Sequence, residues 1–124
     1  MLRISKQTLQ PGVGLLVMKG SIHSGPECVQ IEQEVDALIA AQVTRIIFEM
    51  AEVSHIDSAA IGAFIKCLTK LKKAGGNIRI ATPQPMIRYS LKLTKVDTII
   101  EMFPTVEQAA KGFSASDAST APHS

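Results

Sequence analysis

The chain has 124 residues, of which 46% are hydrophobic and 4% aromatic, and its 13 basic and 11 acidic side chains leave a net charge of +2. This length predicts one domain with a single, mainly aliphatic core, and the balanced charge and few aromatic rings argue against a nucleic-acid partner. Because no apolar run reaches about 18 residues and the N-terminus lacks a signal-peptide pattern, we expect a cytoplasmic protein without membrane insertion.

Short apolar strands alternate with amphipathic helices along the chain. Apolar runs bounded by turn residues indicate the strands, and apolar positions that recur every three to four residues indicate the helices. In chain order we expect strands at 2–9 and 13–20, a helix at 26–42, a strand at 45–50, a connection at 51–57, a helix at 58–73, a strand at 77–82, a helix opened by Pro83 and Pro85 that reaches Leu93, a strand at 98–101 and a helix at 105–113.

The ends of these elements carry turn and capping signals. Pro11-Gly12 marks a tight turn between the first two strands, which predicts an antiparallel hairpin. Ser24 and Glu27 have the spacing of a capping box at the start of the first helix. After the second helix, Gly75-Gly76 supplies the left-handed residue at which helices commonly end.

The order of the elements predicts an α/β fold. The strand and helix alternation after residue 25 favours right-handed crossovers and a largely parallel sheet, to which the hairpin adds an antiparallel strand at one side. We therefore expect a mixed sheet of four to five strands with about four flanking helices, formed by a single domain at residues 1–113. The strand at 45–50 is expected to be buried on both faces. Residues 114–124 are small and polar without periodicity and are predicted to be a disordered tail.

The helix at 58–73 combines an apolar face with a basic one. Lys66, Lys70 and Lys73 are spaced four and three residues apart, so they share one face of the helix. That face is either simply solvated or a docking surface for an acidic partner. The expected core face consists of Ile61, Phe64, Ile65, Leu68 and Leu71.

The segment VSHIDSAAIG at 53–62 is the strongest candidate for a functional site. It joins a buried strand to a helix, and ligands and partners of open α/β sheets bind at that edge. Asp57 and Ser58 are both favourable N-cap residues, so one interpretation is that one of them is simply the cap of the helix. The alternative is that Ser58 is phosphorylated, because the N–H groups and dipole of a helix start favour the roughly −1.5 to −2 charge of a phosphoryl group.

Catalysis and metal binding find little support in the residues. His55, Asp57 and Ser58 are too close in sequence for the base to lie across from the serine with the acid behind it, and no nucleophile-elbow glycines flank the serine. Cys28 and Cys67 are expected to be free buried thiols rather than metal ligands or a disulfide. A glycine-rich phosphate-binding motif is also absent. We therefore expect no enzyme activity, no metal and no cofactor.

Residues 48–62, FEMAEVSHIDSAAIG, resemble the signature of STAS domains, which are named after sulfate transporters and anti-sigma factor antagonists. That signature is an apolar strand followed by Ile-Asp-Ser and a helix with a Gly near its start. The resemblance continues through the strand end at 19–22, the helix–glycine–strand segment at 72–82, the third helix and last strand at 86–100 and the closing helix at 105–113. It covers the chain apart from the tail.

The resemblance implies a STAS-like mixed sheet and a role as a stand-alone anti-sigma factor antagonist in partner switching. Ser58 matches the serine that an anti-sigma factor serine kinase phosphorylates in such proteins. The unphosphorylated protein binds that kinase and frees the sigma factor, and a phosphatase resets the switch. Because isolated STAS domains are mostly monomers, we expect a monomer. The expected partner-binding residues are His23, His55, Asp57, Ser58, Ala59, Ala60, Gly62 and Lys66.

Three positions depart from the family pattern. His23 stands where an acidic residue is common just after a strand end, which bears on the choice of kinase or partner. Ala59 and Ala60 stand where Ser-Gly is common. Lys95 stands where a Gly often follows the third helix, so this turn is either strained or differently shaped. None of these departures removes Ser58.

Two other functions are open on the sequence. A constitutive STAS adaptor subunit of a lipid-transport or signalling assembly would keep the fold and use Ser58 only as a cap or a contact residue. A small enzyme would need catalytic partners for Ser58 that the sequence lacks. The genes encoded beside this one separate the switch from the adaptor, since a serine-kinase anti-sigma factor favours the switch and a transporter ATPase favours the adaptor.

Overall fold

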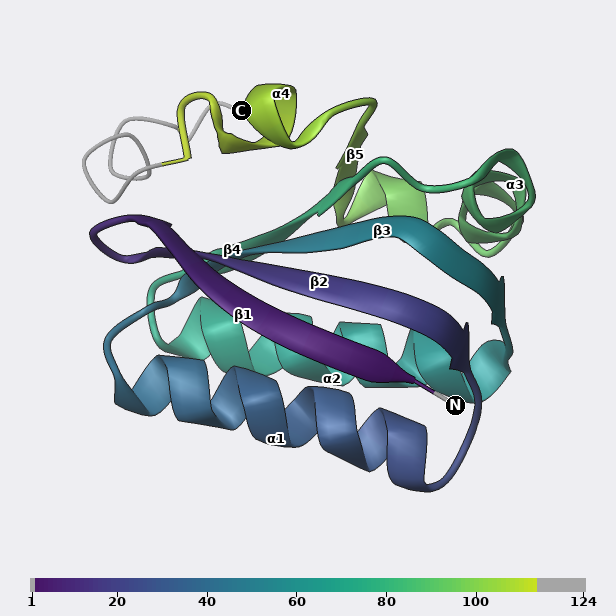
Figure 1. Cartoon of the computed structure of the whole chain (residues 1–124), viewed down its shortest axis with the longest axis horizontal. Helices are drawn as coiled ribbons and strands as arrows, with labels where there is room; N and C mark the ends of the chain where they lie inside the picture. The colour runs from purple at the N-terminus through teal and green to yellow at the C-terminus, as the bar shows by residue number, and fades with distance from the viewer. Residues whose placement is uncertain (1, 114–124) are drawn as a thin grey trace.

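The computed structural model describes residues 2–113, and the predicted tail at 114–124 lies outside them. None of the helices in this described part is long and apolar enough to cross a bilayer. Its elements follow the predicted order along the chain (Figure 1). They are β1 (Arg3–Gln10), β2 (Val13–Ile22), α1 (Pro26–Ala40), β3 (Arg45–Ile56), α2 (Ser58–Lys73), β4 (Asn77–Ala81), α3 (Pro85–Leu93), the 3₁₀-helix η1 (Val96–Thr98), β5 (Glu101–Phe103) and α4 (Val106–Ala110).

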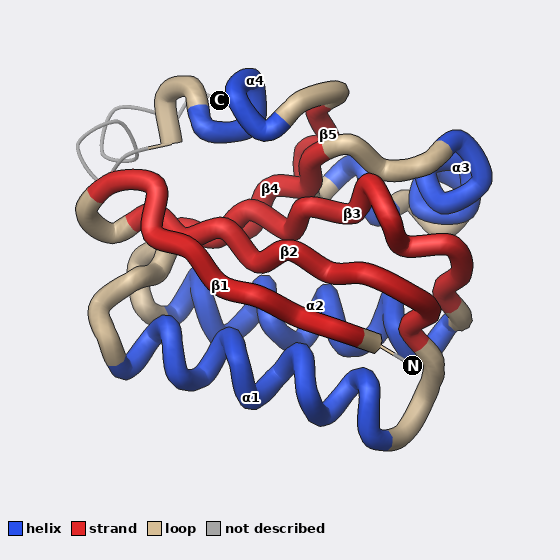
Figure 2. Tube along the Cα trace, viewed as in Figure 1, coloured by secondary structure: helices blue, strands red, loops and turns tan. Residues whose placement is uncertain are grey.

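The strands form one five-stranded sheet in the order β1-β2-β3-β4-β5. β1 pairs with β2 antiparallel through the predicted hairpin, and the other three pairs of neighbours are parallel. Figure 2 shows β1 along one edge of the sheet, with α1 and α2 below the sheet and α4 above it. The predicted α/β class and the mixed sheet of four to five strands with about four helices are confirmed.

Helices cover both faces of the sheet (Figure 1). α1 and α2 lie side by side along one face, and α4 lies over the other. The larger core lies between the sheet and the first two helices, where the Phe48 ring packs edge-on against Phe64 with 5.3 Å between the ring centroids. A smaller core brings Ile47 together with Phe113 beside α4. β3 is therefore buried on both faces, as predicted, with Ile46, Ile47 and Phe48 inaccessible to solvent.

β3 is longer than the sequence indicated, because the expected connection at 51–57 continues the strand as far as Ile56. This second half of the strand pairs with β2 alone, since the pairing with β4 ends at Glu49 and Ala81. The β2–β3 register shifts twice along the way. Such irregularities break the strict alternation of apolar residues from which a strand is predicted. The extension positions the end of β3 beside the end of β2.

The start of α1 differs from the expected capping box. Its N-cap is Gly25, and no side chain caps the helix there. Glu27 instead accepts a hydrogen bond of 2.8 Å from the backbone nitrogen of His23. Gly25 has a φ of 92°, a backbone conformation open to glycine at little cost. The chain therefore enters α1 through a glycine turn rather than through a capping serine.

The last strand and helix lie slightly apart from their expected positions. β5 pairs with β4 at 101–103 rather than at 98–101, because η1 precedes it and Ile100 is a buried core residue. α4 ends before the buried Phe113. Lys95 has a φ of 66° and a ψ of 15°, so this turn does adopt the left-handed conformation for which the family often uses glycine.

Candidate functional site

The ends of β2 and β3 bring two distant turns together at the carboxyl edge of the sheet. Ser21 pairs with His55 and Ile22 with Ile56 in the parallel register. The backbone nitrogen of Asp57 then donates a hydrogen bond of 3.3 Å to the carbonyl oxygen of Ile22. The turn that leads into α1 and the turn that leads into α2 therefore lie side by side.

Asp57 links these two turns through its carboxylate. Oδ1 accepts a hydrogen bond of 3.0 Å from the backbone nitrogen of Ala60, which makes Asp57 the N-cap of α2. Oδ2 accepts one of 3.1 Å from the backbone nitrogen of Ser24 in the other turn. The hydrogen bond from the Ala60 N–H is the main cause that holds the pKa of Asp57 below its usual range, against the opposite effect of desolvation. The Ser24 N–H and the electrostatic effect of His23 lower this pKa further.

Ser58 is the exposed first residue of α2. Because Asp57 caps the helix, the Ser58 hydroxyl is not needed for that purpose, and its phosphorylation stays a prediction. Within residues 2–113 no hydrogen bond engages this hydroxyl. An anion attached there would lie at the positive end of the helix dipole. The helix start therefore favours a negative charge at this position.

His23 and His55 form a pair beside this helix start. Both residues are exposed, and their ring centroids lie 5.0 Å apart with the planes tilted by 45°. His23 Nδ1 also lies 3.6 Å from Oε1 of Glu27 in α1. Glu27 was not identified from the sequence as a site residue, although it lies in the first turn of α1, which begins at this edge. Glu27 thus places a carboxylate directly beside His23.

The remaining predicted contact residues are divided between core and surface. Ala60 is completely buried and offers no surface to a partner, which corrects the expectation for that residue. Ala59 is half-buried, and Gly62 and Lys66 are exposed. The small residues after Ser58 thus serve two purposes. The buried Ala60 lets α2 pack closely on the sheet, and the exposed Gly62 keeps the outer surface low.

The buried face of α2 differs from the predicted one by about one position. Ile65 is 39% exposed, and Ile61 is only half-buried at the margin of the core. Ile61 follows Ser58 by three positions and Ile65 follows Ile61 by four, so both lie on the same face of α2 as Ser58. They therefore add apolar surface next to the exposed hydroxyl. The buried positions are Ala60, Ala63, Phe64, Cys67, Leu68 and Leu71.

Two of the α2 lysines form ion pairs with α1. Lys70 donates to Asp36 Oδ1 at 3.0 Å, and this hydrogen bond is the main cause of the raised pKa of Lys70. Lys66 Nζ lies 3.6 Å from Glu32 Oε1. Part of the basic face of α2 thus forms intramolecular ion pairs with α1. It is neither merely solvated nor fully free for an acidic partner.

The geometry offers no catalytic arrangement around Ser58. The Asp57 carboxylate is occupied by two backbone N–H groups rather than placed behind a histidine. Among the described residues, no group of three or more His, Cys, Asp or Glu side chains could hold a metal ion. Cys28 and Cys67 are free and buried, as predicted. Desolvation raises the pKa of the Cys67 thiol to about 12, so it is inert as a nucleophile.

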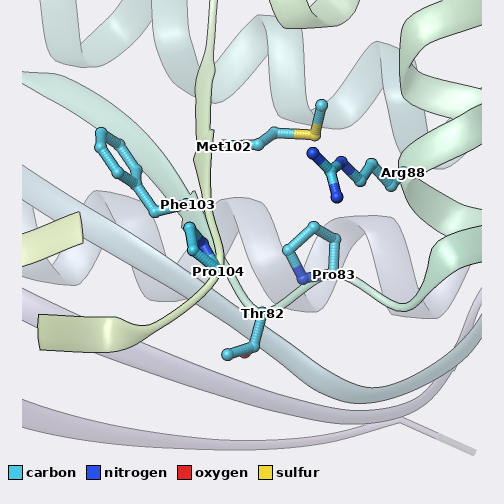
Figure 3. Close-up of a pocket in the computed structure, with 6 residues that line it drawn as sticks. All are labelled: Thr82, Pro83, Arg88, Met102, Phe103 and Pro104. Carbon is cyan, nitrogen blue, oxygen red and sulfur yellow. The ribbon is translucent and has the colours of Figure 1, made fainter. Parts of the chain in front are cut away.

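A cavity of about 320 Å³ lies between the β4–α3 connection and β5 (Figure 3). Figure 3 shows the guanidinium of Arg88, which extends from α3 into the space between Pro83 and Met102. None of the residues predicted to bind a partner lines this cavity. The exposed helix start with Ser58 is therefore a separate surface and remains the candidate site.

A family model of the STAS domain matches residues 7–109, so the chain belongs to the STAS domain family. A relative from Thermotoga maritima, which carries the provisional name anti-sigma factor antagonist, is 24% identical over 74 residues. The match spans 60% of this chain and 66% of that protein, slightly less than two thirds of the relative's length.

Solved structures of anti-sigma factor antagonists share the fold. One from Mycobacterium paratuberculosis superposes with a TM-score of 0.77 at 19% identity, over 91% of this chain and 94% of the other. The Bacillus cell fate determinant SpoIIAA in its phosphorylated form superposes with a TM-score of 0.70 at 18% identity, over 88% of this chain and 97% of that protein. At these identities the likeness shows the fold alone.

Proposed function

We propose that this protein is a cytoplasmic anti-sigma factor antagonist that phosphorylation of Ser58 switches off. In its unphosphorylated form it binds an anti-sigma factor serine kinase, and the phosphorylated form is released until a phosphatase restores it. The observation that carries this proposal is the exposed Ser58 hydroxyl at the start of α2, freed from capping by Asp57. The relatives named as anti-sigma factor antagonists support the same class of function.

The surface next to Ser58 gives a physical reason for the switch. Ile61 and Ile65 present apolar area, and Gly62 leaves the surface low enough for close approach. A partner that covers this area would also desolvate Ser58. A phosphoryl group there would add roughly −1.5 to −2 charge, next to the carboxylate of Asp57. Burying that charge without a cationic partner is costly, so docking would be opposed while the helix start keeps the fold intact.

The phosphorylation itself is tested with the cognate kinase and ATP, followed by mass spectrometry of the intact protein and its peptides. We expect one phosphoryl group on Ser58 and none on the Ser58→Ala variant. Ser54→Ala is the matched control, because Ser54 is an exposed serine on the neighbouring strand end. Phosphorylation of Ser58→Ala to the wild-type extent would contradict the proposal.

The effect on binding is tested with Ser58→Asp, which places a permanent negative charge at the helix start. We expect its affinity for the kinase to fall at least about tenfold. Its free energy of unfolding should stay within about 1 kcal/mol of the wild-type value, since the helix dipole favours the charge. Thr69→Asp adds the same charge on an exposed position of α2 farther along the helix and should bind normally.

A constitutive adaptor subunit is the second candidate, favoured by the exposed apolar face of α3. Met86, Tyr89 and Leu93 lie at helical spacing and are 76%, 61% and 63% exposed. This surface does not depend on the state of Ser58. An adaptor would bind its assembly equally well as wild type and as Ser58→Asp but would lose binding on Tyr89→Ser, whereas the switch predicts loss on Ser58→Asp.

A further inference from the structure

A cavity of about 200 Å³ opens at the amino ends of β3 and β4, at the other end of β3 from Ser58. Three cationic residues line it, Arg45, Lys72 and Arg79. Its lining contains no carboxylate. The remaining wall is formed mainly by glycines and an amide side chain, so the positive charges face a space with little bulk. A concentration of one sign of charge around a small cavity predicts an anionic ligand.

Arg45 is the strongest indication of such a ligand. It is only 8% exposed and is the buried charged residue of the described chain. Its Nη2 donates a hydrogen bond of 3.1 Å to the carbonyl oxygen of Gly75. Within residues 2–113 no carboxylate lies within 4.0 Å of the Arg45 guanidinium, the distance of an ion pair. A buried charge without an opposite charge is costly, and the carbonyl end of α2 supplies only about half an elementary charge.

The other lining groups add fixed and adjustable donors. Arg79 Nη1 donates hydrogen bonds of 2.9 Å to the carbonyl oxygens of Ala109 and Lys111, and the guanidinium lies 4.2 Å from the centroid of the Phe113 ring. Its ion-pair partner Glu101 is exposed and 3.9 Å distant, so it screens the charge weakly. Lys72 is exposed on the last turn of α2 and free to reorient over the cavity mouth.

Asn77 completes the donor set. Its Oδ1 accepts a hydrogen bond of 2.8 Å from the backbone nitrogen of Ile78, which leaves the amide nitrogen as a donor. The adjacent Gly75 has a φ of 84° and open space where a Cβ would lie. A polyatomic oxyanion matches this set, because a guanidinium can bind two of its oxygens at once while ammonium and amide groups bind the others.

We propose that this cavity binds a phosphate group, carried either by inorganic phosphate or by a small phosphate ester. The volume limits the ester to one with a small substituent. The site is independent of Ser58 and of the partner surface on α2. A phosphate bound there would compensate the buried charge of Arg45 and would therefore stabilise the fold by mass action.

The proposal is tested on the full ¹⁵N-labelled chain by NMR titration with sodium phosphate and, separately, with glycerol 3-phosphate, each at constant ionic strength. We expect saturable shifts of the amides of Gly75, Gly76 and Asn77, and a rise in Tm that follows the ligand concentration. Tighter binding of glycerol 3-phosphate identifies an ester as the ligand class, and tighter binding of phosphate identifies the free ion. Shifts that do not saturate, or that sodium chloride reproduces, would overturn the proposal.

Two lysine variants form the matched comparison. Lys72 lines the cavity and its neighbour Lys73 does not, yet both are exposed in the last turn of α2 and carry the same charge. Lys72→Ala should weaken phosphate binding roughly fivefold, and Lys73→Ala should leave it nearly unchanged. Equal effects of the two would show general screening rather than a site. Arg45→Met should abolish both the shifts and the rise in Tm, and if it does not fold, the lysine pair still decides.

Discussion

Ser24 and Asp57 lie 33 positions apart in the sequence and are joined by a hydrogen bond of 3.1 Å from the Ser24 backbone nitrogen to the Asp57 carboxylate. The same carboxylate caps α2 through the Ala60 backbone nitrogen. One side chain therefore fixes the turn before α1 and the start of α2 together. The residue next to Ser58 thus holds the candidate site in shape, and it does so through its charge.

Substitution of Asp57 should lower stability in a graded order. Asp57→Asn keeps an oxygen for the Ala60 N–H but turns a donor toward the Ser24 N–H, so it loses one of the two bonds. Asp57→Ala loses both bonds. We expect the Tm to fall from wild type to Asp57→Asn and further to Asp57→Ala in thermal unfolding followed by circular dichroism. A Tm for Asp57→Ala equal to that of the wild type would show that the carboxylate does not hold the turns.

The stabilisation by Asp57 should also depend on pH. Its folded-state pKa is depressed, chiefly by the Ala60 N–H, so the ionised form is favoured in the folded protein. The contribution is complete above the unfolded pKa of about 3.9 and is lost as pH falls through the lower folded pKa. The difference in Tm between wild type and Asp57→Asn should therefore be constant near neutral pH and shrink below about pH 4. A difference that grows on acidification would contradict this sign.

Much of the fold follows from the sequence because its elements are locally encoded. The alternation of apolar strands and amphipathic helices predicts the order of the elements, and the position of Ser58 at a helix start follows from the residues around it. The second half of β3 could not be predicted, because two register shifts against β2 place Val53 and Ile56 in the core out of strict alternation.

The details of the site depend on contacts between distant segments. His23 and His55 meet only because of the β2–β3 register, and Ser24 reaches Asp57 only because β2 and β3 end together. The hydrophobicity pattern predicts that Ile65 rather than Cys67 lies on the buried face of α2, because isoleucine is the more hydrophobic residue. This prediction is wrong. The structure buries Cys67 at a position where the helix lies close to its neighbours. Small residues repeated every three to four positions are the signal that identifies such a face.

Replacing Lys95 by glycine should relieve the backbone strain of the left-handed turn at this position. A non-glycine residue pays roughly 1–2 kcal/mol in this conformation, and part of the gain from glycine is offset by the greater freedom of the unfolded chain. Lys95→Gly should therefore raise the free energy of unfolding by about 0.5–1 kcal/mol in urea denaturation. Lys95→Ala removes the same charge but keeps the strain, so it should show no gain. Equal values for the two variants would mean that the charge, not the backbone, matters.

Gly62 and Gly76 should respond to alanine in opposite ways, since one lies on an open helix surface and the other against a backbone. An added Cβ at Gly62 meets no atom within 4 Å, and alanine is the better helix former, so Gly62→Ala should raise the free energy of unfolding by about 1 kcal/mol. At Gly76 the Cβ would collide with the Thr44 carbonyl and lie 2.8 Å from the Thr44 Cβ. Gly76→Ala should therefore lower the free energy of unfolding by about 3 kcal/mol.

The stabilised Gly62→Ala variant also tests the partner surface. A bulkier residue beside Ser58 should weaken kinase binding, although the fold is more stable. Unchanged binding would remove Gly62 from the contact surface.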